Sequence, residues 1–302
     1  MSKKRVVIFG NQLLALDLVT YLLKAKQYEI VGIVCHARDY DKGENPWYPS
    51  LKKFALQKKL LVFAPAKLAS KSFLQKMEKL QPDIIITASY RKIIPLKIIN
   101  LAKRSAFNVH GSLLPRHRGW APLNWAIIRG EKVSGSTAHF LSGKVDEGNI
   151  IAQAKFKITK KDDAAIVINK MRKTDLLVAK KALKFLENEN FKGYKQNERE
   201  TTYNPRRQPA DGHINWSQSS EDIYNFVRAL VKPFPGAFSF YDRKKVFIWK
   251  VKSVPFSKGV FVPGTIITAR GSPIVATADG AVKIIDFDFD KKVNFIIGRR
   301  FK

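Results

Sequence analysis

Two polar residues, Asn108 and His110, stand one residue apart at the end of an apolar run, and an acidic residue follows in Asp146-Glu-Gly148. On an extended backbone Asn108 and His110 point to the same face, because side chains alternate along a strand. An amide donor beside an imidazole suits acyl transfer, in which a tetrahedral oxyanion is held and protons are moved. Two simpler interpretations stay open at this point: a structural histidine, and an aspartate that only forms the turn before Gly148.

The elements that must position these residues follow from the hydrophobic pattern. Short apolar runs alternate with amphipathic segments, which is typical of a mostly parallel sheet with helices on both faces. Ligands usually bind at the carboxyl edge of such a sheet, where Asn108 and His110 would lie. The expected strands are 6–10, 29–35, 61–64, 84–88, 105–110, 135–141 and 149–157. The expected helices are 13–24, 50–59, 70–80, 120–129 and 164–187.

The character of the chain changes after the last of these helices. Residues 188–215 are polar, contain Pro205 and Pro209, and show neither hydrophobic period, which indicates a linker. Beyond a helix at 219–231, strand-like segments separated by turns predict a small β-barrel. We therefore predict a Rossmann-like α/β catalytic domain over residues 1–189, a linker over 190–215 and a C-terminal β domain over 216–302.

Composition narrows the class of protein. Among 302 residues, 55 Lys and Arg face 25 Asp and Glu, and a formal charge of +30 attracts anions such as phosphates, nucleic acid or folate carboxylates. The alternative is a lysine-rich surface that reflects only compositional bias, since the lysines are scattered. The single cysteine, Cys35, excludes an intramolecular disulfide and a cysteine-based metal site, and fits a reducing cytoplasm. The sequence shows neither a signal-peptide core nor a membrane span, so a soluble protein is expected.

The longer segment from Asn108 to Trp125 resembles the folate-dependent formyltransferase family. In that family Asn-x-His, Ser-Leu-Leu-Pro, Arg-Gly and Asp-x-Gly occur in this order and spacing, and here they fall on Asn108, His110, Ser112–Pro115, Arg118-Gly119 and Asp146-x-Gly148. The family includes methionyl-tRNA formyltransferase, sugar-nucleotide N-formyltransferases and, more distantly, glycinamide ribonucleotide transformylase. The resemblance implies that Asn108 and His110 stabilise the tetrahedral adduct, while Asp146 orients or charges His110 and helps to accept the amine proton. It also implies that no metal is needed and that the C-terminal barrel is OB-like.

The same resemblance implies a pocket for 10-formyltetrahydrofolate, the formyl donor. The residues expected to line this pocket are Lys92, Ile93, Ile94, Trp120, Ser142, Gly143, Lys144 and Val145. A tryptophan such as Trp120 equally suits a hydrophobic core. A nicotinamide cofactor is not expected, because Phe9-Gly10-Asn11-Gln12 lacks the glycine spacing of a dinucleotide fingerprint.

The formyl acceptor separates two branches of the family, and three features resemble the sugar-nucleotide branch. Residues 35–49 lack the Lys/Arg-rich loop of bacterial initiator-tRNA formyltransferases, His110 is followed by Gly-Ser, and the segments 206–216 and 233–238 are similar to the sugar branch. The residues expected to contact the substrate are Trp47, Tyr48, Ser112, Arg206 and Arg207. Paired guanidinium groups suit a diphosphate, although adjacent arginines are usually only solvated.

The sequence therefore predicts a sugar N-formyltransferase that acts on a nucleotide-linked 4-amino sugar. Products of such enzymes usually enter lipopolysaccharide or other surface glycans, and a homodimer is compatible with the resemblance. The charge of +30 keeps methionyl-tRNA formyltransferase, with initiator tRNA as its partner, as the alternative. A non-catalytic binding module is a third alternative, against which the intact Asn108, His110 and Asp146 argue.

Overall fold

The computed structural model describes residues 2–36, 49–255, 261–269, 271–289 and 294–302. The chain divides into two compact units, each with its own core. The first unit comprises residues 1–119, 134–156 and 169–203, and the second comprises residues 120–133, 157–168 and 204–302. Two segments that precede residue 189, 120–133 and 157–168, thus belong to the second unit. The domain boundaries at residues 189 and 215 stay a proposal.

The first unit contains a seven-stranded sheet in the order β3-β2-β1-β4-β5-β7-β8. Its strands are β1 (Lys4–Gly10), β2 (Tyr28–Val34), β3 (Val62–Phe63), β4 (Ile84–Ala88), β5 (Ser105–His110), β7 (Val133–Phe140) and β8 (Ile150–Lys157). The pairs from β3 through β5 are parallel, and β7 runs antiparallel to β5. The expected mostly parallel sheet is confirmed.

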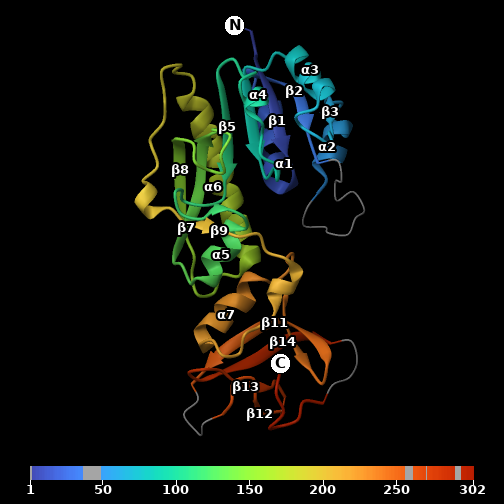
Figure 1. Ribbon diagram of the computed structural model, residues 1–302, viewed down its shortest axis with the longest axis vertical. Helices are drawn as coiled ribbons and strands as arrows, with labels where there is room; N and C mark the ends of the chain where they lie inside the picture. The colour runs from blue at the N-terminus through green and yellow to red at the C-terminus, as the bar shows by residue number, and fades with distance from the viewer. Residues whose placement is uncertain (1, 37–48, 256–260, 270, 290–293) are drawn as a thin grey trace. The chain divides into compact units, whose positions relative to one another are not determined.

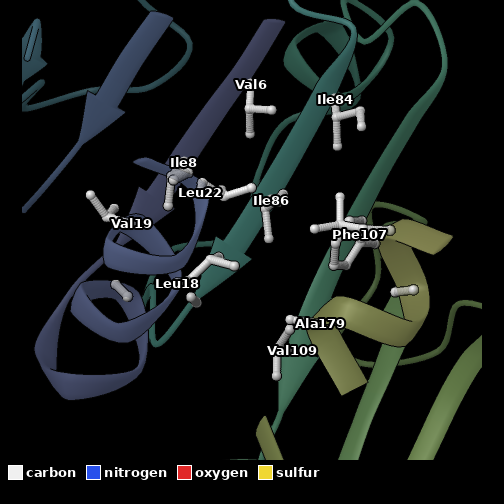
Figure 2. Packing of buried hydrophobic residues seen from close by; sticks show 14 of the residues in the cluster. Val6, Ile8, Leu18, Val19, Leu22, Ile84, Ile86, Phe107, Val109 and Ala179 are labelled. Carbon is white, nitrogen blue, oxygen red and sulfur yellow. The ribbon is translucent and has the colours of Figure 1, made fainter. Parts of the chain in front are cut away.

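Helices cover both faces of this sheet (Figure 1). They are α1 (Gln12–Lys24), α2 (Leu51–Gln57), α3 (Lys71–Lys79), α4 (Leu96–Ile99) and α6 (Ala164–Phe185). Alternate residues of β1 enter two different cores, because successive side chains of a strand point to opposite faces. Val6 and Ile8 pack with α1, α2 and α6, whereas Val7 and Phe9 pack with α3 and α4. Figure 2 shows the first core, in which Leu18 of α1 and Ala179 of α6 lie over the side chains of β1, β4 and β5.

The second unit is built on a five-stranded antiparallel sheet in the order β10-β11-β14-β13-β12. Its strands are β10 (Ala237–Tyr241), β11 (Lys244–Val254), β12 (Ile266–Thr268), β13 (Ile274–Ala276) and β14 (Ala281–Phe289). Two helices belong to the same unit, α5 (Pro122–Ile128) and α7 (Ser220–Ala229), and Asn124 Nδ2 donates to the carbonyl of Ala229 at 2.7 Å. The predicted order of an α/β part followed by an all-β part is confirmed.

The segment expected to be a linker carries short regular structure. It contains the 3₁₀ helices η1 (Glu198–Glu200) and η2 (Pro209–Gly212), and β9 (Tyr203–Asn204), which pairs with β6 (Arg118–Gly119). Arg118 N donates to Thr202 O at 2.8 Å, so this segment runs beside the motif that follows His110. No helix among the described residues combines the length and apolar character needed to cross a bilayer.

Candidate active site

The register of the sheet sets three polar side chains in a row. Thr87 on β4 stands opposite Asn108 on β5, and Asn108 stands opposite His139 on β7. Thr87 Oγ1 donates to Asn108 Oδ1 at 2.6 Å, and Asn108 Nδ2 lies 3.1 Å from His139 Nε2. Because Thr87 occupies the carbonyl end of the amide, the NH₂ end of Asn108 is the donor turned toward the remaining polar groups.

Asp146 reaches this row from the turn between β7 and β8. Its Oδ1 atom lies 3.4 Å from Asn108 Nδ2 and 3.3 Å from His139 Nε2, and its Oδ2 atom lies 3.5 Å from His110 Nδ1. Gly119 N donates to Oδ2 at 2.9 Å. The structure therefore brings together the three residues on which the sequence analysis centred, and adds His139 and the Gly119 amide.

The surroundings of Asp146 favour its charged form. The side chain is only 11% exposed, and this burial by itself would raise the pKa of the carboxyl. The opposite charge available on His110, the hydrogen bond and charge of His139, and the Gly119 N–H outweigh burial and hold the pKa of Asp146 well below its usual range. Asp146 is thus a carboxylate at neutral pH, placed to support positive charge on a neighbouring imidazole.

The two histidines are fixed by backbone carbonyls. His110 Nε2 lies 2.8 Å from His117 O and His139 Nδ1 lies 2.9 Å from Phe140 O. A carbonyl only accepts, so each of these nitrogens carries a hydrogen. His110 Nδ1 is then the nitrogen that can exchange a proton, and it is the one that faces Asp146. This arrangement couples an amide donor, a proton-exchanging imidazole and a carboxylate, the groups that acyl transfer to an amine needs.

The segments expected to bind the formyl donor have different environments. Ile93 is 62% exposed, while Ile94 is buried in the core formed with α3 and α4. Lys92 Nζ donates to Ala66 O at 2.8 Å, and Lys144 Nζ lies 3.3 Å from the Glu147 carboxylate. The Ile94 side chain is therefore part of the core, whereas the Ile93 side chain is open to a ligand.

The loop 142–145 lies next to the start of α4. A Cβ on Gly143, whose φ is +78°, would come within 2.9 Å of the Leu96 side chain. Ser142 and Val145 are exposed on this loop. The loop and the segment after β4 thus lie together in the first unit, as a shared pocket requires. Trp120 belongs to the second unit, where Arg206 lies over its ring at 5.3 Å.

The residues expected to bind the acceptor fall into three groups. Trp47 and Tyr48 lie outside the described residues. Ser112 is buried and its hydroxyl donates to Arg116 O at 2.7 Å, which gives it a place in the loop after β5. Arg206 is exposed, whereas Arg207 lies between the rings of Trp125 and Phe226, within 5.1 and 5.4 Å of their centroids.

Sequence reasoning missed two side chains of the site, Thr87 and His139. Both are polar residues inside buried strands, and that contrast is the signal that could have found them. Their partner could not be named, because sequence does not give the register between β5 and β7. Among the described residues, no three His, Cys, Asp or Glu side chains are grouped to hold a metal ion.

Two family models together match most of this chain. Residues 3–183 match the family model described as formyl transferase, and residues 206–295 match formyl transferase, C-terminal domain. A bifunctional polymyxin resistance protein ArnA from Wigglesworthia glossinidia brevipalpis is 35% identical over 263 residues, 87% of this chain and 40% of that protein. The chain thus spans well under half of that relative.

Two further proteins extend the comparison over nearly the whole chain. A methionyl-tRNA formyltransferase from Acetivibrio thermocellus is 32% identical over 288 residues, 95% of this chain and 92% of that protein. An N-formyltransferase from Helicobacter canadensis, solved with folinic acid and dTDP-3-aminofucose, has a TM-score of 0.73 at 22% identity, over 95% of this chain and 100% of that one. At that identity the structural likeness shows the fold.

Proposed function

Because the chain belongs to the formyl transferase family, we propose that it transfers the formyl group of 10-formyltetrahydrofolate to the amino group of a nucleotide-linked 4-amino sugar. The observation that carries the reaction type is the cluster of Asn108, His110 and Asp146, whose polar atoms lie within 3.5 Å of one another through Asp146. It is an enzyme site rather than a binding module. The cytoplasm, where both reactants of such an enzyme occur, is its proposed location.

The proposed mechanism assigns one task to each group. The neutral amine attacks the formyl carbon, and the new oxyanion accepts from the Asn108 NH₂ and from protonated His110. As the C–N bond to the carrier breaks, protonated His110 gives its Nδ1 proton to the leaving nitrogen and then takes up the proton that the amine loses, so tetrahydrofolate is released and the amide product is neutral. Asp146 stays ionised throughout and stabilises the positive charge on His110, in keeping with its depressed pKa.

The choice of a sugar acceptor is supported by the sequence features of the sugar branch and by the ligands of the Helicobacter canadensis neighbour. That protein was solved with folinic acid and with dTDP-3-aminofucose, a nucleotide-linked amino sugar. Arg206 is the proposed diphosphate ligand, since it is exposed, whereas Arg207 is stacked between two rings and donates to Asp211 O.

A second acceptor, initiator methionyl-tRNA, is favoured by one specific observation. The formal charge of +30 suits a polyanion better than a small diphosphate. The methionyl-tRNA formyltransferase from Acetivibrio thermocellus matches 95% of this chain. Both acceptors would use the same donor and the same three side chains, so the difference lies in acceptor binding alone.

The test is formyl transfer from 10-formyltetrahydrofolate to UDP-, dTDP- and GDP-linked 3- and 4-amino sugars and, in parallel, to initiator methionyl-tRNA. Each assay is run at about 50 and about 200 mM salt, a range over which contacts to six to ten phosphates lose about 10³–10⁵ in affinity. We expect turnover of a 4-amino sugar nucleotide with a change of less than about threefold between the two salts. Formylation of the tRNA alone, with a steep salt dependence, would instead establish the second acceptor.

A matched pair of arginine variants tests the diphosphate contact. Arg206→Ala should raise the KM for the sugar nucleotide by about tenfold, the size expected for one charge-assisted contact. Arg199→Ala removes an equal charge from an exposed site on η1 and should leave that KM unchanged. Equal effects of the two variants would show that only net charge matters, and would remove Arg206 as a ligand.

A further inference from the structure

Among the described residues, the largest fully buried side chain is that of Arg118, which directly precedes the Gly119 amide of the site. Its Nε and Nη2 atoms donate to Gln196 Oε1 at 3.1 and 2.8 Å, and Nη1 and Nη2 donate to the Glu198 carboxylate at 3.1 and 2.7 Å. Nη1 also donates to Tyr203 Oη at 3.0 Å. A buried guanidinium is costly unless its donors are paired, and here two acceptors and a hydroxyl pair them.

Gln196 links this guanidinium to the turn that carries Asp146. Since Arg118 occupies Oε1, the orientation of the Gln196 amide is set and its NH₂ faces the other way. Gln196 Nε2 donates to Asp146 O at 2.7 Å and to Gly148 O at 2.8 Å. Both ends of the Gln196 side chain are thus saturated, one by a fixed positive charge and the other by two backbone carbonyls of the turn.

The turn needs such support because its backbone is strained at Asp146. The φ of Asp146 is +54°, in the left-handed region that non-glycine residues adopt at a cost of about 1–2 kcal/mol. Such a conformation persists only where the surroundings hold it. Gly148, which precedes β8, has no room for a side chain, because a Cβ there would clash with the Phe140 carbonyl oxygen. The turn is therefore tied at both carbonyls by Gln196 and confined against β7.

We propose that Gln196, fixed by the buried Arg118, is a positioning residue that holds the Asp146 carboxylate at His110 and Asn108. The dipeptide Arg118-Gly119 then acts on Asp146 twice, through Gln196 on its backbone carbonyl and through the Gly119 N–H on its carboxylate. This inference rests on the proposed catalytic role of Asp146. It is independent of which amine accepts the formyl group.

The decisive variant is Gln196→Glu, which keeps the size of the side chain and an oxygen for Arg118. Its second oxygen would face the carbonyls of Asp146 and Gly148, so both donors to the turn are lost. We expect kcat to fall by about 10–100-fold, the cost of displacing a reacting group by about 1 Å, with the KM for the amine within about threefold. Gln196→Met, which also removes both donors, serves in its place if the glutamate variant does not fold.

Glu198→Gln is the matched control, because Glu198 binds the same guanidinium but contacts no atom of the turn in the hydrogen bonds described. Its kcat should stay within about threefold of the parent. Equal losses in Glu198→Gln and Gln196→Glu would show that Arg118 only stabilises the fold, and would overturn the inference. Thermal unfolding of each variant separates loss of activity from loss of structure.

A readout that needs no acceptor is the ¹³C resonance of the Asp146 carboxyl, assigned with Asp146→Asn. In the parent its pKa lies well below the usual range, and an Asp146 loosened from His110, His139 and Gly119 should titrate at higher pH in Gln196→Glu. An unchanged titration with an unchanged kcat would exclude the positioning role while leaving the proposed function intact. Full activity of Asp146→Asn would instead remove the catalytic assignment itself.

Discussion

Two buried aspartates of the first unit differ in how their surroundings treat a negative charge. Asp146, in the turn before β8, is 11% exposed, and Asp175, on α6, is 1% exposed. Burial raises the pKa of both, yet the pKa of Asp146 lies well below its usual range and that of Asp175 is raised to about 7. Burial alone therefore does not decide whether a carboxyl is ionised.

The partners explain the difference. Asp146 has His110, His139 and the Gly119 N–H within reach of its two oxygens. For Asp175, burial has the largest effect and raises the pKa. The Ser136 hydroxyl lowers the pKa only partly, and the negative charge of Asp17 raises it further. Its Oδ1 atom has no hydrogen-bond partner within the part of the chain that the structure describes. A buried carboxyl with cations and donors around it stays ionised, whereas one without them has a raised pKa and keeps its proton to higher pH.

The largest effect is expected when the charge of Asp146 is removed. Asp146→Asn keeps the size of the side chain but offers no anion to His110, so formyl transfer should fall by about 10²–10⁴-fold, the range of one acid–base partner. Single-turnover kinetics with the acceptor found active would measure this loss. His110→Ala should give a loss of similar size, and full activity in either variant would contradict the site.

His139 tests the second partner of the same carboxylate. His139→Ala removes the ring that lies 3.3 Å from Asp146 Oδ1 and 3.1 Å from Asn108 Nδ2, while His110 remains. We expect kcat to fall by about tenfold, since two catalytic groups lose one of their fixed contacts. His213→Ala, at an exposed histidine of the second unit, is the control and should keep the parent's kcat. A loss confined to thermal stability would reduce His139 to a structural residue.

Asp175 should affect stability and leave chemistry alone. Its pKa of about 7 in the folded state exceeds the value of about 4 in an unfolded chain, so the native state holds an extra proton between these pH values. The contribution of Asp175 to the free energy of unfolding is therefore greatest below about pH 4, and it falls as the pH rises to about 7. Asp175→Asn has no proton to lose and should gain stability relative to the parent between pH 5 and 8, on the order of 2–4 kcal/mol.

Urea unfolding at pH 5 and at pH 8 measures this difference in stability. As the control, the kcat of Asp175→Asn should stay within about threefold of the parent. Parallel pH dependences of the parent and Asp175→Asn would show that Asp175 is ionised in the folded protein. That result would remove the contrast with Asp146.

The smallest effect concerns the single hydroxyl that opposes burial at Asp175. Ser136→Ala removes the group that lowers the pKa of Asp175 and also its contact with Thr174 Oγ1 at 2.7 Å. Stability at pH 8 should fall by about 1 kcal/mol, the net worth of one hydrogen bond, and by less at pH 5, where the carboxyl is protonated. A loss that is equal at both pH values would assign it to Thr174 instead.

Local pattern in the sequence was enough for part of this result. The alternation of apolar runs predicts β1, β4 and β5 and the helices α1, α2 and α3, because burial against a sheet demands that pattern, whereas the short helix α4 was not predicted. The Asn108-x-His110 spacing on an expected strand end places two side chains on one face for the same reason. The apolar character of residues 84–88 and 105–110 likewise predicts that both strands are buried in the sheet.

The tertiary structure decided the rest. His139 meets Asn108 only through the antiparallel register of β5 and β7, and a shift of one residue would turn it to the other face. Arg118 and Gln196 are 78 residues apart, and the opposite pKa shifts of Asp146 and Asp175 depend on which groups the fold brings to each carboxyl. The sequence by itself predicted Asn108, His110 and Asp146 as the catalytic residues and placed the first two at the end of a strand. Their protonation and mutual placement are set by contacts between distant segments, because desolvation and charge act through space rather than along the chain.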